Sequence, residues 1–207
     1  MGNMLTAKVV VRGTRPLFWH AFGPESIPLD KRKEKTGVAG NDPEEWRNTI
    51  LCAKTGQLFV RGDYIFGALR DGSKYTKDGR YSIQKKVQST LQVAEDRVFV
   101  DRYMPGTVDG VYDPKTAPEP PTDPEEPVYL DVRSCVNPNT RSRNVRYRVA
   151  SCPGWRATFT IQWDATIVPR ALMEATIIDA GTLCGLGDGR NIGMGRFVIE
   201  SFEIAAA

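Results

Sequence analysis

The sequence has only one histidine, His20, and its four cysteines, Cys52, Cys135, Cys152 and Cys184, are far apart. No two cysteines form a CxxC pair, so a zinc site has too few ligands, and we expect neither a metal nor another cofactor. No GKS or GKT follows a glycine-rich stretch, which excludes a Walker nucleotide-binding loop. No apolar run approaches roughly eighteen residues, so we expect no transmembrane helix and no membrane partner.

The composition that remains is that of a globular protein able to bury a core, with 207 residues, 41% hydrophobic and 26% charged. The first residues, MGNMLTAKVVV, lack a basic region followed by a long apolar core, so we expect a cytoplasmic protein with reduced cysteines. The formal net charge is +3. Residues 113–127 hold five acids and one lysine, so the rest of the chain is at +7, a mild basic bias compatible with a polyanionic partner.

Residue patterning predicts an α+β protein. Runs of β-branched and alternating apolar residues predict strands at 5–12, 56–62, 89–102, 128–133, 133–151, 157–167 and 196–204. Helices are predicted at 42–53, 63–75 and 168–184, with Asp42 and Asp63 as N-caps. This order favours one ferredoxin-like, RNA-recognition-type domain over residues 1–207. Two long insertions interrupt it, at about 13–56 and 73–156, and the second holds a solvated acidic loop at 113–127.

A glycine-rich loop with the sequence GLGDGRNIGMGRF follows the last predicted helix and precedes the last predicted strand. A dinucleotide-binding fingerprint has the reverse context, after a strand and before a helix, so that interpretation is excluded. Backbone N–H groups of such a loop approach phosphates closely, and arginines add charge. A flexible turn packed against the sheet remains the alternative. The loop residues assigned to this role are Gly185, Gly187, Arg190, Gly193, Gly195 and Arg196.

A helix, the spacing GxGxxxxxGxG and an aromatic-bearing last strand together resemble the RAMP superfamily, the RNA-binding proteins of CRISPR systems. The stretch LFVRGDYIFGALR at 58–70 is similar to the Gly-Ala-Leu-Arg-like element found early in that superfamily. The two insertions make the layout most similar to the backbone subunits that polymerise along a guide RNA. One departure is the turn before the helix, where Arg61, Gly62 and Asp63 replace the usual Pro-Gly-Ser-Ser.

The resemblance implies sequence-independent binding of single-stranded guide RNA in a CRISPR-type ribonucleoprotein. The implied partners are the guide RNA, a complementary target strand, copies of the same chain and other subunits of the complex. In this reading the helix after residue 62 lies near the guide phosphates, which adds Arg70 and Lys74 to the predicted contacts. Arg12 and Arg61 are predicted as further RNA contacts.

An arginine cluster with interleaved asparagines lies within the arginine-rich turn and strand predicted at 133–151. Its members are Arg133, Arg141, Arg143, Arg146 and Arg148. On a strand, alternate residues share a face, so Arg146 and Arg148 point the same way and suit a single-stranded backbone. A solvated edge strand is the alternative. Because few acids interleave with the arginines, we favour RNA contact.

Two residues raise the alternative of an endoribonuclease that processes guide RNA, so enzymatic activity stays open. His20 is of a residue type that serves as general base for a ribose 2′-OH, although neighbouring aromatic residues favour a packed histidine. Asp30 is placed like the RNA-cleaving aspartate of some type III backbone subunits, although its charged surroundings favour a solvated loop. A third alternative is an interaction module of the same fold that binds no nucleic acid.

Overall fold

The computed structural model describes residues 3–23, 42–136, 141 and 143–205. The chain divides into two compact units. The first consists of Met1–Leu17, Phe59–Asp101 and Pro153–Ala207, and the second of Phe18–Leu58 and Arg102–Cys152. No described helix is long and apolar enough to cross a membrane. All four cysteines are free thiols.

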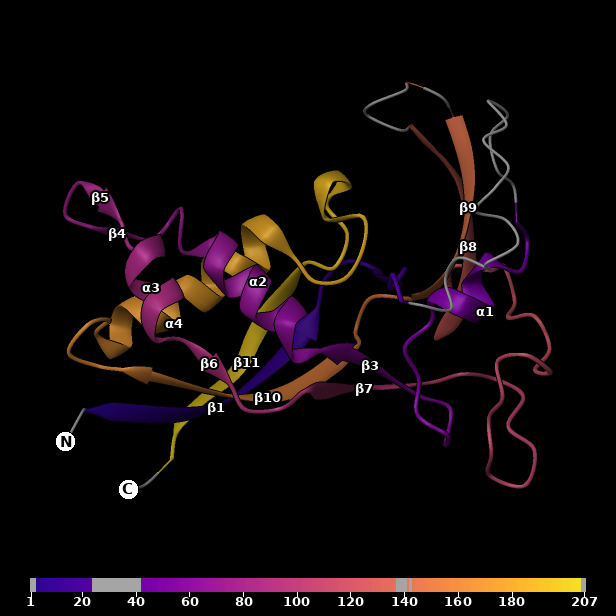
Figure 1. The fold of residues 1–207 in the computed structure, drawn as a ribbon, viewed down its shortest axis with the longest axis horizontal. Coiled ribbons are helices and arrows are strands. Elements are labelled where there is room, and N and C mark those ends of the chain that lie inside the picture. Colours follow the sequence, from indigo (N-terminus) through magenta and orange to yellow (C-terminus); the bar gives the residue numbers. More distant parts are fainter. Residues whose placement is uncertain (1–2, 24–41, 137–140, 142, 206–207) are drawn as a thin grey trace. The chain divides into compact units, whose positions relative to one another are not determined.

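The first unit is built on a six-stranded sheet (Figure 1). Its strands are β1 (Met4–Gly13), β3 (Gln57–Arg61), β6 (Gln92–Val93), β7 (Arg97–Tyr103), β10 (Arg156–Asp164) and β11 (Phe197–Ile204). The spatial order is β11-β1-β10-β7-β3, and β6 also pairs with β10. β1 is antiparallel to β10 and β11, and β10 is antiparallel to β6 and β7.

Helices α2 (Gly62–Gly72), α3 (Gln84–Thr90) and α4 (Arg170–Asp179) lie on one face of this sheet, as Figure 1 shows. A π-helical turn, η3 (Ala180–Cys184), continues α4. The chain order β1-α2-β7-β10-α4-β11 is the βαββαβ order of a ferredoxin-like core, and β3 adds an edge strand. The predicted fold class is therefore confirmed.

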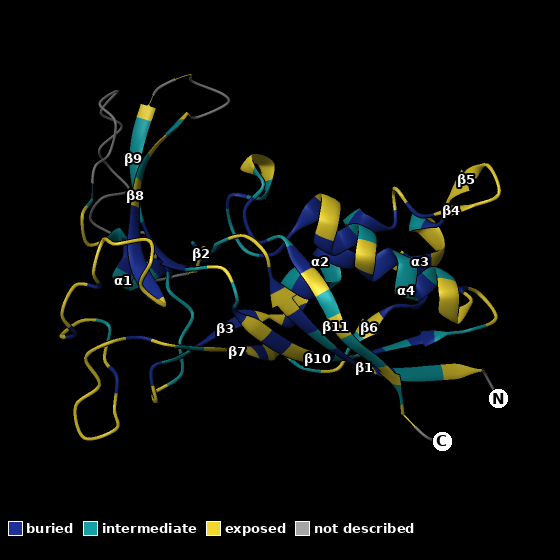
Figure 2. Ribbon diagram, turned by 180° about the vertical axis from the view of Figure 1, so that it is seen from behind, coloured by how far each residue is buried: buried dark blue, intermediate teal, exposed yellow. Residues whose placement is uncertain are grey.

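Side-chain alternation explains how the sheet acquires a covered face and an open face. In β1, Ala7, Val9 and Val11 are buried, whereas Lys8 and Arg12 are exposed on the open face (Figure 2). In α2 the buried residues recur at helical spacing and include Ile65, Ala68, Leu69 and Gly72. Trp155 and Trp163 of the same unit are fully buried and fill its core.

Gly72, at the end of α2, allows this helix to approach η3 closely. A Cβ atom at Gly72 would lie 2.6 Å from the backbone nitrogen of Ala180. Gly181 plays the same part between η3 and β11, since its Cβ would lie 2.3 Å from the carbonyl oxygen of Phe197. Such contacts are possible only without side chains, so these glycines hold the end of α2 beside the segment that leads into the glycine-rich loop.

The second unit contains a three-stranded sheet, β2-β9-β8, made of β2 (Leu17–Trp19), β8 (Val128–Val136) and β9 (Arg143–Ser151). β8 and β9 are antiparallel, with Val128 opposite Ser151. A short helix, α1 (Glu45–Thr49), packs against β9 and buries Trp46 completely. Phe18 of β2 is also fully buried.

The structure corrects several local predictions. The helix predicted at 42–53 spans only Glu45–Thr49, and just before it Asp42 Oδ1 accepts a hydrogen bond from the backbone N–H of Glu44 (3.1 Å). Helix α2 begins at Gly62, with no side-chain cap from Asp63. The strand predicted at 89–102 is replaced by the end of α3 followed by β6 and β7. Ile83, Val87 and Thr90 are buried at helical spacing, and this packing outweighs the strand propensity of the sequence.

The acidic segment at 113–127 is also more anchored than a solvated loop. Ala117 and Pro120 are buried, and Nη1 of Arg47 donates to the carbonyl oxygens of Pro114 and Ala117. One arginine thus fixes two turns of a segment that has no regular secondary structure. The assignment of residues 1–207 to a single domain with insertions at 13–56 and 73–156 stays a prediction.

Candidate nucleic-acid interface

The glycine-rich loop leaves η3 at Gly185 and reaches β11 at Phe197. It contains one 3-10 turn, η4 (Arg190–Ile192), and five glycines with positive φ, at 185, 187, 189, 193 and 195. At Gly195 the backbone is so close to Leu186 that a Cβ would lie 1.9 Å from the Leu186 carbonyl oxygen. The glycines therefore close the loop on itself, and the loop has a defined shape.

Most of the predicted glycine amides are used to hold this shape. Three of the four donate to carbonyl oxygens of the protein: Gly185 to Ala180 (2.8 Å), Gly193 to Arg190 (3.1 Å) and Gly195 to Pro16 (2.7 Å). The expectation that these three amides are offered to a phosphate is corrected by this arrangement. Gly187 is the one predicted glycine whose amide has no backbone partner among the described residues.

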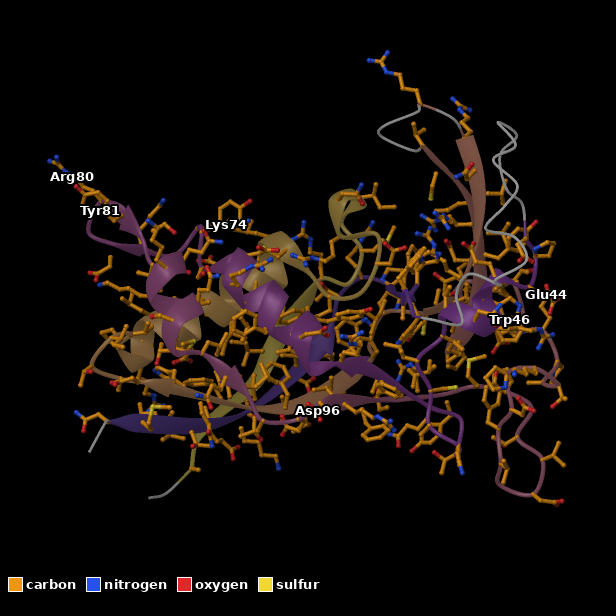
Figure 3. All side chains as sticks on the ribbon, in the orientation of Figure 1. Glu44, Trp46, Lys74, Arg80, Tyr81 and Asp96 are labelled. Atoms are coloured by element: carbon orange, nitrogen blue, oxygen red, sulfur yellow. The ribbon has the colours of Figure 1, made fainter. Side chains whose placement is uncertain are left out.

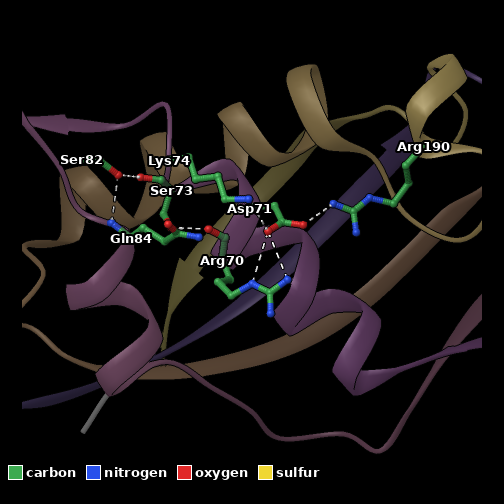
Figure 4. A network of polar contacts seen from close by, with 7 residues as sticks. All are labelled: Arg70, Asp71, Ser73, Lys74, Ser82, Gln84 and Arg190. Carbon is green, nitrogen blue, oxygen red and sulfur yellow. Dashed lines mark hydrogen bonds and ion pairs between the residues drawn. The ribbon is translucent and has the colours of Figure 1, made fainter.

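Charged side chains from α2 and the loop meet at Asp71, beside the exposed Lys74 (Figures 3 and 4). Arg190 Nη2 lies 2.7 Å from Asp71 Oδ2, and Lys74 Nζ lies 3.1 Å from Asp71 Oδ1. Arg70 Nη2 is 3.2 Å from the same Oδ1 atom. We call Arg70, Asp71, Lys74 and Arg190 the Asp71 cluster. It unites three predicted RNA contacts, although Asp71 and Arg190 are 119 residues apart in sequence.

The Asp71 cluster carries more positive than negative charge. Burial raises the pKa of Asp71, but hydrogen bonds from Arg190, Lys74 and Arg70 outweigh burial and lower it. Asp71 is therefore ionised at neutral pH and balances one of three cations. The side chains of Arg70, Lys74 and Arg190 remain 40%, 51% and 32% exposed, so each keeps part of its charged group in contact with solvent.

A hollow of about 480 Å³ opens beside this cluster. Asp71, Lys74 and Tyr75 line it from one side, and Asp188 and Arg190 are among the loop residues that line it from the other. Its volume is within the usual range for small-molecule sites. Sequence reasoning missed Tyr75 and Asp188, although Tyr75 directly follows the predicted Lys74 on the same exposed segment.

The loop also contains arginine donors that lack an acceptor. Arg190 Nε and Arg196 Nη1 are shielded from solvent and have no hydrogen-bond partner among the described residues. An unsatisfied buried donor costs about 1–3 kcal/mol. An added acceptor at this loop, such as a phosphate oxygen, would relieve that cost if it displaced the atoms that cover these donors.

The structure does not bring Arg12 and Arg61 into this cluster. Arg12 lies on the open face of the sheet, where its Nε is 3.1 Å from Oε1 of Glu200, and Glu200 also binds Arg156. Arg61 precedes the N-terminal end of α2 and pairs with Asp63. Both cations therefore have local acidic partners away from the glycine-rich loop.

Three arginines of the second unit bind acidic side chains: Arg133 and Arg148 bind Asp131, and Arg146 binds Glu45. Arg148 is 3% exposed, and its Nη2 lies 3.1 Å from Asp131 Oδ2. Arg133 binds the other oxygen of Asp131, with its Nε at 2.8 Å. Both guanidinium groups also lie over the ring of Phe18, within 5 Å of its centroid. This cluster is therefore mainly a structural network of the second unit.

Arg146 belongs to a second network, with Glu45 and His20. Its Nη1 pairs with Glu45 Oε1, and His20 Nε2 lies 3.0 Å from the same oxygen. Burial raises the pKa of Glu45, but hydrogen bonds from His20 and the backbone N–H of Tyr147, together with the charge of Arg146, bring it to about 2. His20 is mostly buried in this network.

Two arginines of the sequence cluster remain on the surface, namely Arg141 and Arg143. Arg141 has a positive φ of 55°. Asp30 lies outside the described residues. Few acids interleave with the arginine cluster, as the sequence indicates, but Asp131 and Glu45 from outside 133–148 pair with Arg133, Arg146 and Arg148.

No family model matches the chain, and no curated protein matches it. Among solved structures, the chain is similar to a chain of the "Cryo-EM structure of the Type III-B Cmr-beta bound to cognate target RNA". The similarity has a TM-score of 0.45 and 14% sequence identity, and it covers 98% of this chain. This chain spans 61% of the length of that chain.

Proposed function

We propose that the protein binds single-stranded RNA by its sugar-phosphate backbone, on the surface formed by the Asp71 cluster and the glycine-rich loop. The observation that carries the proposal is the ion pair between Asp71 and Arg190. This pair joins the end of α2, which carries the 58–70 element, to the loop at 185–197. These are the two motifs on which the resemblance to the RAMP superfamily rests, and the ferredoxin-like topology agrees with it.

The chemistry of the cluster suits phosphate. Each guanidinium has five N–H donors, and Asp71 occupies at most two of those on Arg70 and one on Arg190. Asp71 thus orients the two guanidinium groups. Their exposed N–H groups that do not bind Asp71 stay available for phosphate oxygens. Contacts of this kind carry no base specificity and depend strongly on salt.

In the finer form of the proposal, the chain is a repeating backbone subunit that binds guide RNA in a CRISPR-type ribonucleoprotein. Its partners are then a guide RNA, a target strand, further copies of the chain and other subunits. The quoted motifs support this form, and a single interface repeated head to tail is sufficient to build such a filament. We do not propose the endoribonuclease alternative, because no described contact favours it and His20 is enclosed with Glu45 and Arg146.

A binding experiment tests the proposal. Fluorescence anisotropy with labelled single-stranded RNA is measured over a series of salt concentrations for the wild type and for Lys74→Ala/Arg190→Ala. We expect the double variant to bind about tenfold more weakly or worse, since two charge-assisted contacts are lost. The slope of log K against log salt should decrease in magnitude by about 1.4, because each phosphate contact on a single strand contributes about 0.7.

Lys8→Ala is the matched control, because Lys8 is an exposed cation on the open face of the same sheet. We expect its affinity and salt slope to equal those of the wild type. Equal losses in Lys8→Ala and the double variant would mean that only general charge matters, which contradicts a defined site. Absence of RNA binding by the wild type would contradict the proposal itself.

A further inference from the structure

A basic segment at residues 74–86 follows α2 and is not explained by phosphate binding alone. Its thirteen residues include five lysines or arginines, and Asp78 is its single acid. Strands β4 (Lys77–Asp78) and β5 (Tyr81–Ser82) form a hairpin within it, with Gly79 and Arg80 at the turn. We call residues 74–86 the basic hairpin segment.

The base of this hairpin is firmly attached to the first unit. Ser82 Oγ donates to the carbonyl oxygen of Ser73 (2.9 Å; Figure 4). Thr76 Oγ1 donates to Asp179 Oδ2 (2.6 Å), which ties the segment to α4. Ile83 is 1% exposed and anchors the return of the chain into α3. The position of the tip is therefore set by contacts at its base.

The basic hairpin segment exposes two aromatic rings among its cations, Tyr81 beside the turn and Tyr75 at the base. Tyr81 is 80% exposed and Tyr75 is 54% exposed. Within the described part of the chain, Tyr81 has no ring contact and no side-chain hydrogen bond. Arg80 is adjacent at the turn, and Lys77 pairs across the hairpin with Ser82. A large ring held in water on a fixed support provides a flat surface for stacking.

The hairpin lies on the same side of the sheet as the glycine-rich loop, with the C-terminal end of α2 between them (Figure 1). Figure 3 shows Lys74 between the hairpin, marked by Arg80 and Tyr81, and the loop. Lys74 belongs to the Asp71 cluster, and Tyr75 lines the hollow beside it. The cationic surface is thus continuous from the loop to the start of the hairpin segment.

We propose that the basic hairpin segment binds the bases of the same single-stranded RNA, with Tyr81 and Tyr75 as stacking platforms. This inference rests on the proposed function, because the Asp71 cluster holds the phosphates. The excess of cations complements a polyanion, and aromatic rings interleaved with cations are how single-stranded nucleic acids are bound without base preference. The segment thereby makes the protein selective for unpaired strands, whose bases are free to stack.

The test separates base stacking from phosphate binding. Anisotropy is measured with an oligouridine of about twelve nucleotides, within the usual site size, and with an abasic ribose-phosphate strand of equal length. We expect Tyr81→Ala to weaken binding of oligouridine about fivefold or more, the factor that corresponds to the loss of one stacked base. Tyr81→Phe should retain wild-type affinity, and neither variant should change binding of the abasic strand.

Tyr103→Ala is the matched control, since Tyr103 is another exposed tyrosine, 57% accessible, outside the segment. Circular dichroism confirms that each variant is folded. Unchanged oligouridine affinity in Tyr81→Ala, with weaker binding by Lys74→Ala/Arg190→Ala, overturns this inference and leaves the proposed function standing. Loss of a protein partner or of vesicle binding in Tyr81→Ala, without loss of RNA affinity, also overturns it. A wild type that binds neither strand refutes the proposed function.

Discussion

At the scale of single residues, acidic side chains determine which arginines are available to a ligand. Asp131 holds Arg148 in the interior of the second unit, and Glu45 holds Arg146. Asp71 binds three cations whose side chains are 32% to 51% exposed, and Arg146 at 33% lies within the same range. The number of arginines in a stretch of sequence therefore overstates the charge that a phosphate can reach.

Glu45 gives a pH-dependent prediction for stability. Its pKa in the folded protein is about 2, below the ordinary value of 4.5, so its network stabilises the folded state fully above pH 4.5. This stabilisation is lost as the pH falls from 4.5 towards 2. We expect Glu45→Gln to have a lower Tm than the wild type at pH 6, and the difference between the two to narrow as the pH is lowered through this window.

Thermal melts at several pH values measure this difference. Glu44→Gln is the control, because Glu44 is the exposed neighbour and pairs only with Arg47 in the ion pairs described. We expect its Tm to follow that of the wild type closely. A constant gap between Glu45→Gln and the wild type from pH 6 to pH 3 would contradict a protonation-linked role for Glu45.

At the scale of elements, close backbone approaches place α2 beside the glycine-rich loop. A Cβ atom added at Gly72 would lie 2.6 Å from the backbone nitrogen of Ala180 in η3. A Cβ atom added at Gly67 of the same helix would have open space around it. We expect Gly72→Ala to destabilise the protein by about 1–3 kcal/mol, the usual cost of overpacking. Gly67→Ala should instead stabilise it by about 0.5–1 kcal/mol, since alanine is the better helix former.

Urea unfolding of the two alanine variants measures these free energies. We also expect Gly72→Ala to bind RNA more weakly, because displacement of α2 from η3 separates Asp71 from Arg190. Equal stability of the two variants would show that the contact with Ala180 relaxes without cost. Unchanged RNA affinity in a destabilised Gly72→Ala would separate this contact from the site.

Elements with clear periodicity could be predicted from the sequence, and elements defined by tertiary packing could not. Alternation located β1, β10 and β11, and the chain order of helices and strands indicated the ferredoxin-like core. The single strand predicted at 89–102 was wrong at its start. Thr90 is β-branched and favours a strand, but it packs as the last residue of α3. Strand β2 was missed, since three residues are too few to show a period.

The candidate site could be predicted only in part. The sequence identifies three of its cations near two recognisable motifs, namely Arg70, Lys74 and Arg190. Their convergence on Asp71 depends on contacts between α2 and η3, which no local pattern reports. The neutralisation of Arg146 by Glu45 joins residues 101 positions apart, so the sequence around either one gives no sign of the pair.

At the scale of the whole molecule, the cations of the two units differ in their surroundings. In the first unit an exposed cluster, a glycine-rich loop and a basic hairpin segment lie on one side of a sheet. In the second unit Asp131 and Glu45 pair with Arg133, Arg148 and Arg146, and Arg141 and Arg143 are exposed. Because only the first unit combines exposed cations with the glycine-rich loop, we propose that it carries the principal RNA surface.

Photo-crosslinking of thiouridine-containing RNA to the purified protein, followed by mass spectrometry of the peptides, tests this assignment most directly. We expect crosslinked peptides from residues 62–86 and 185–196, with loss of those crosslinks in Lys74→Ala/Arg190→Ala and their retention in Lys8→Ala. Crosslinks confined to residues 102–152, or none above the level of a non-binding control protein, would contradict the account.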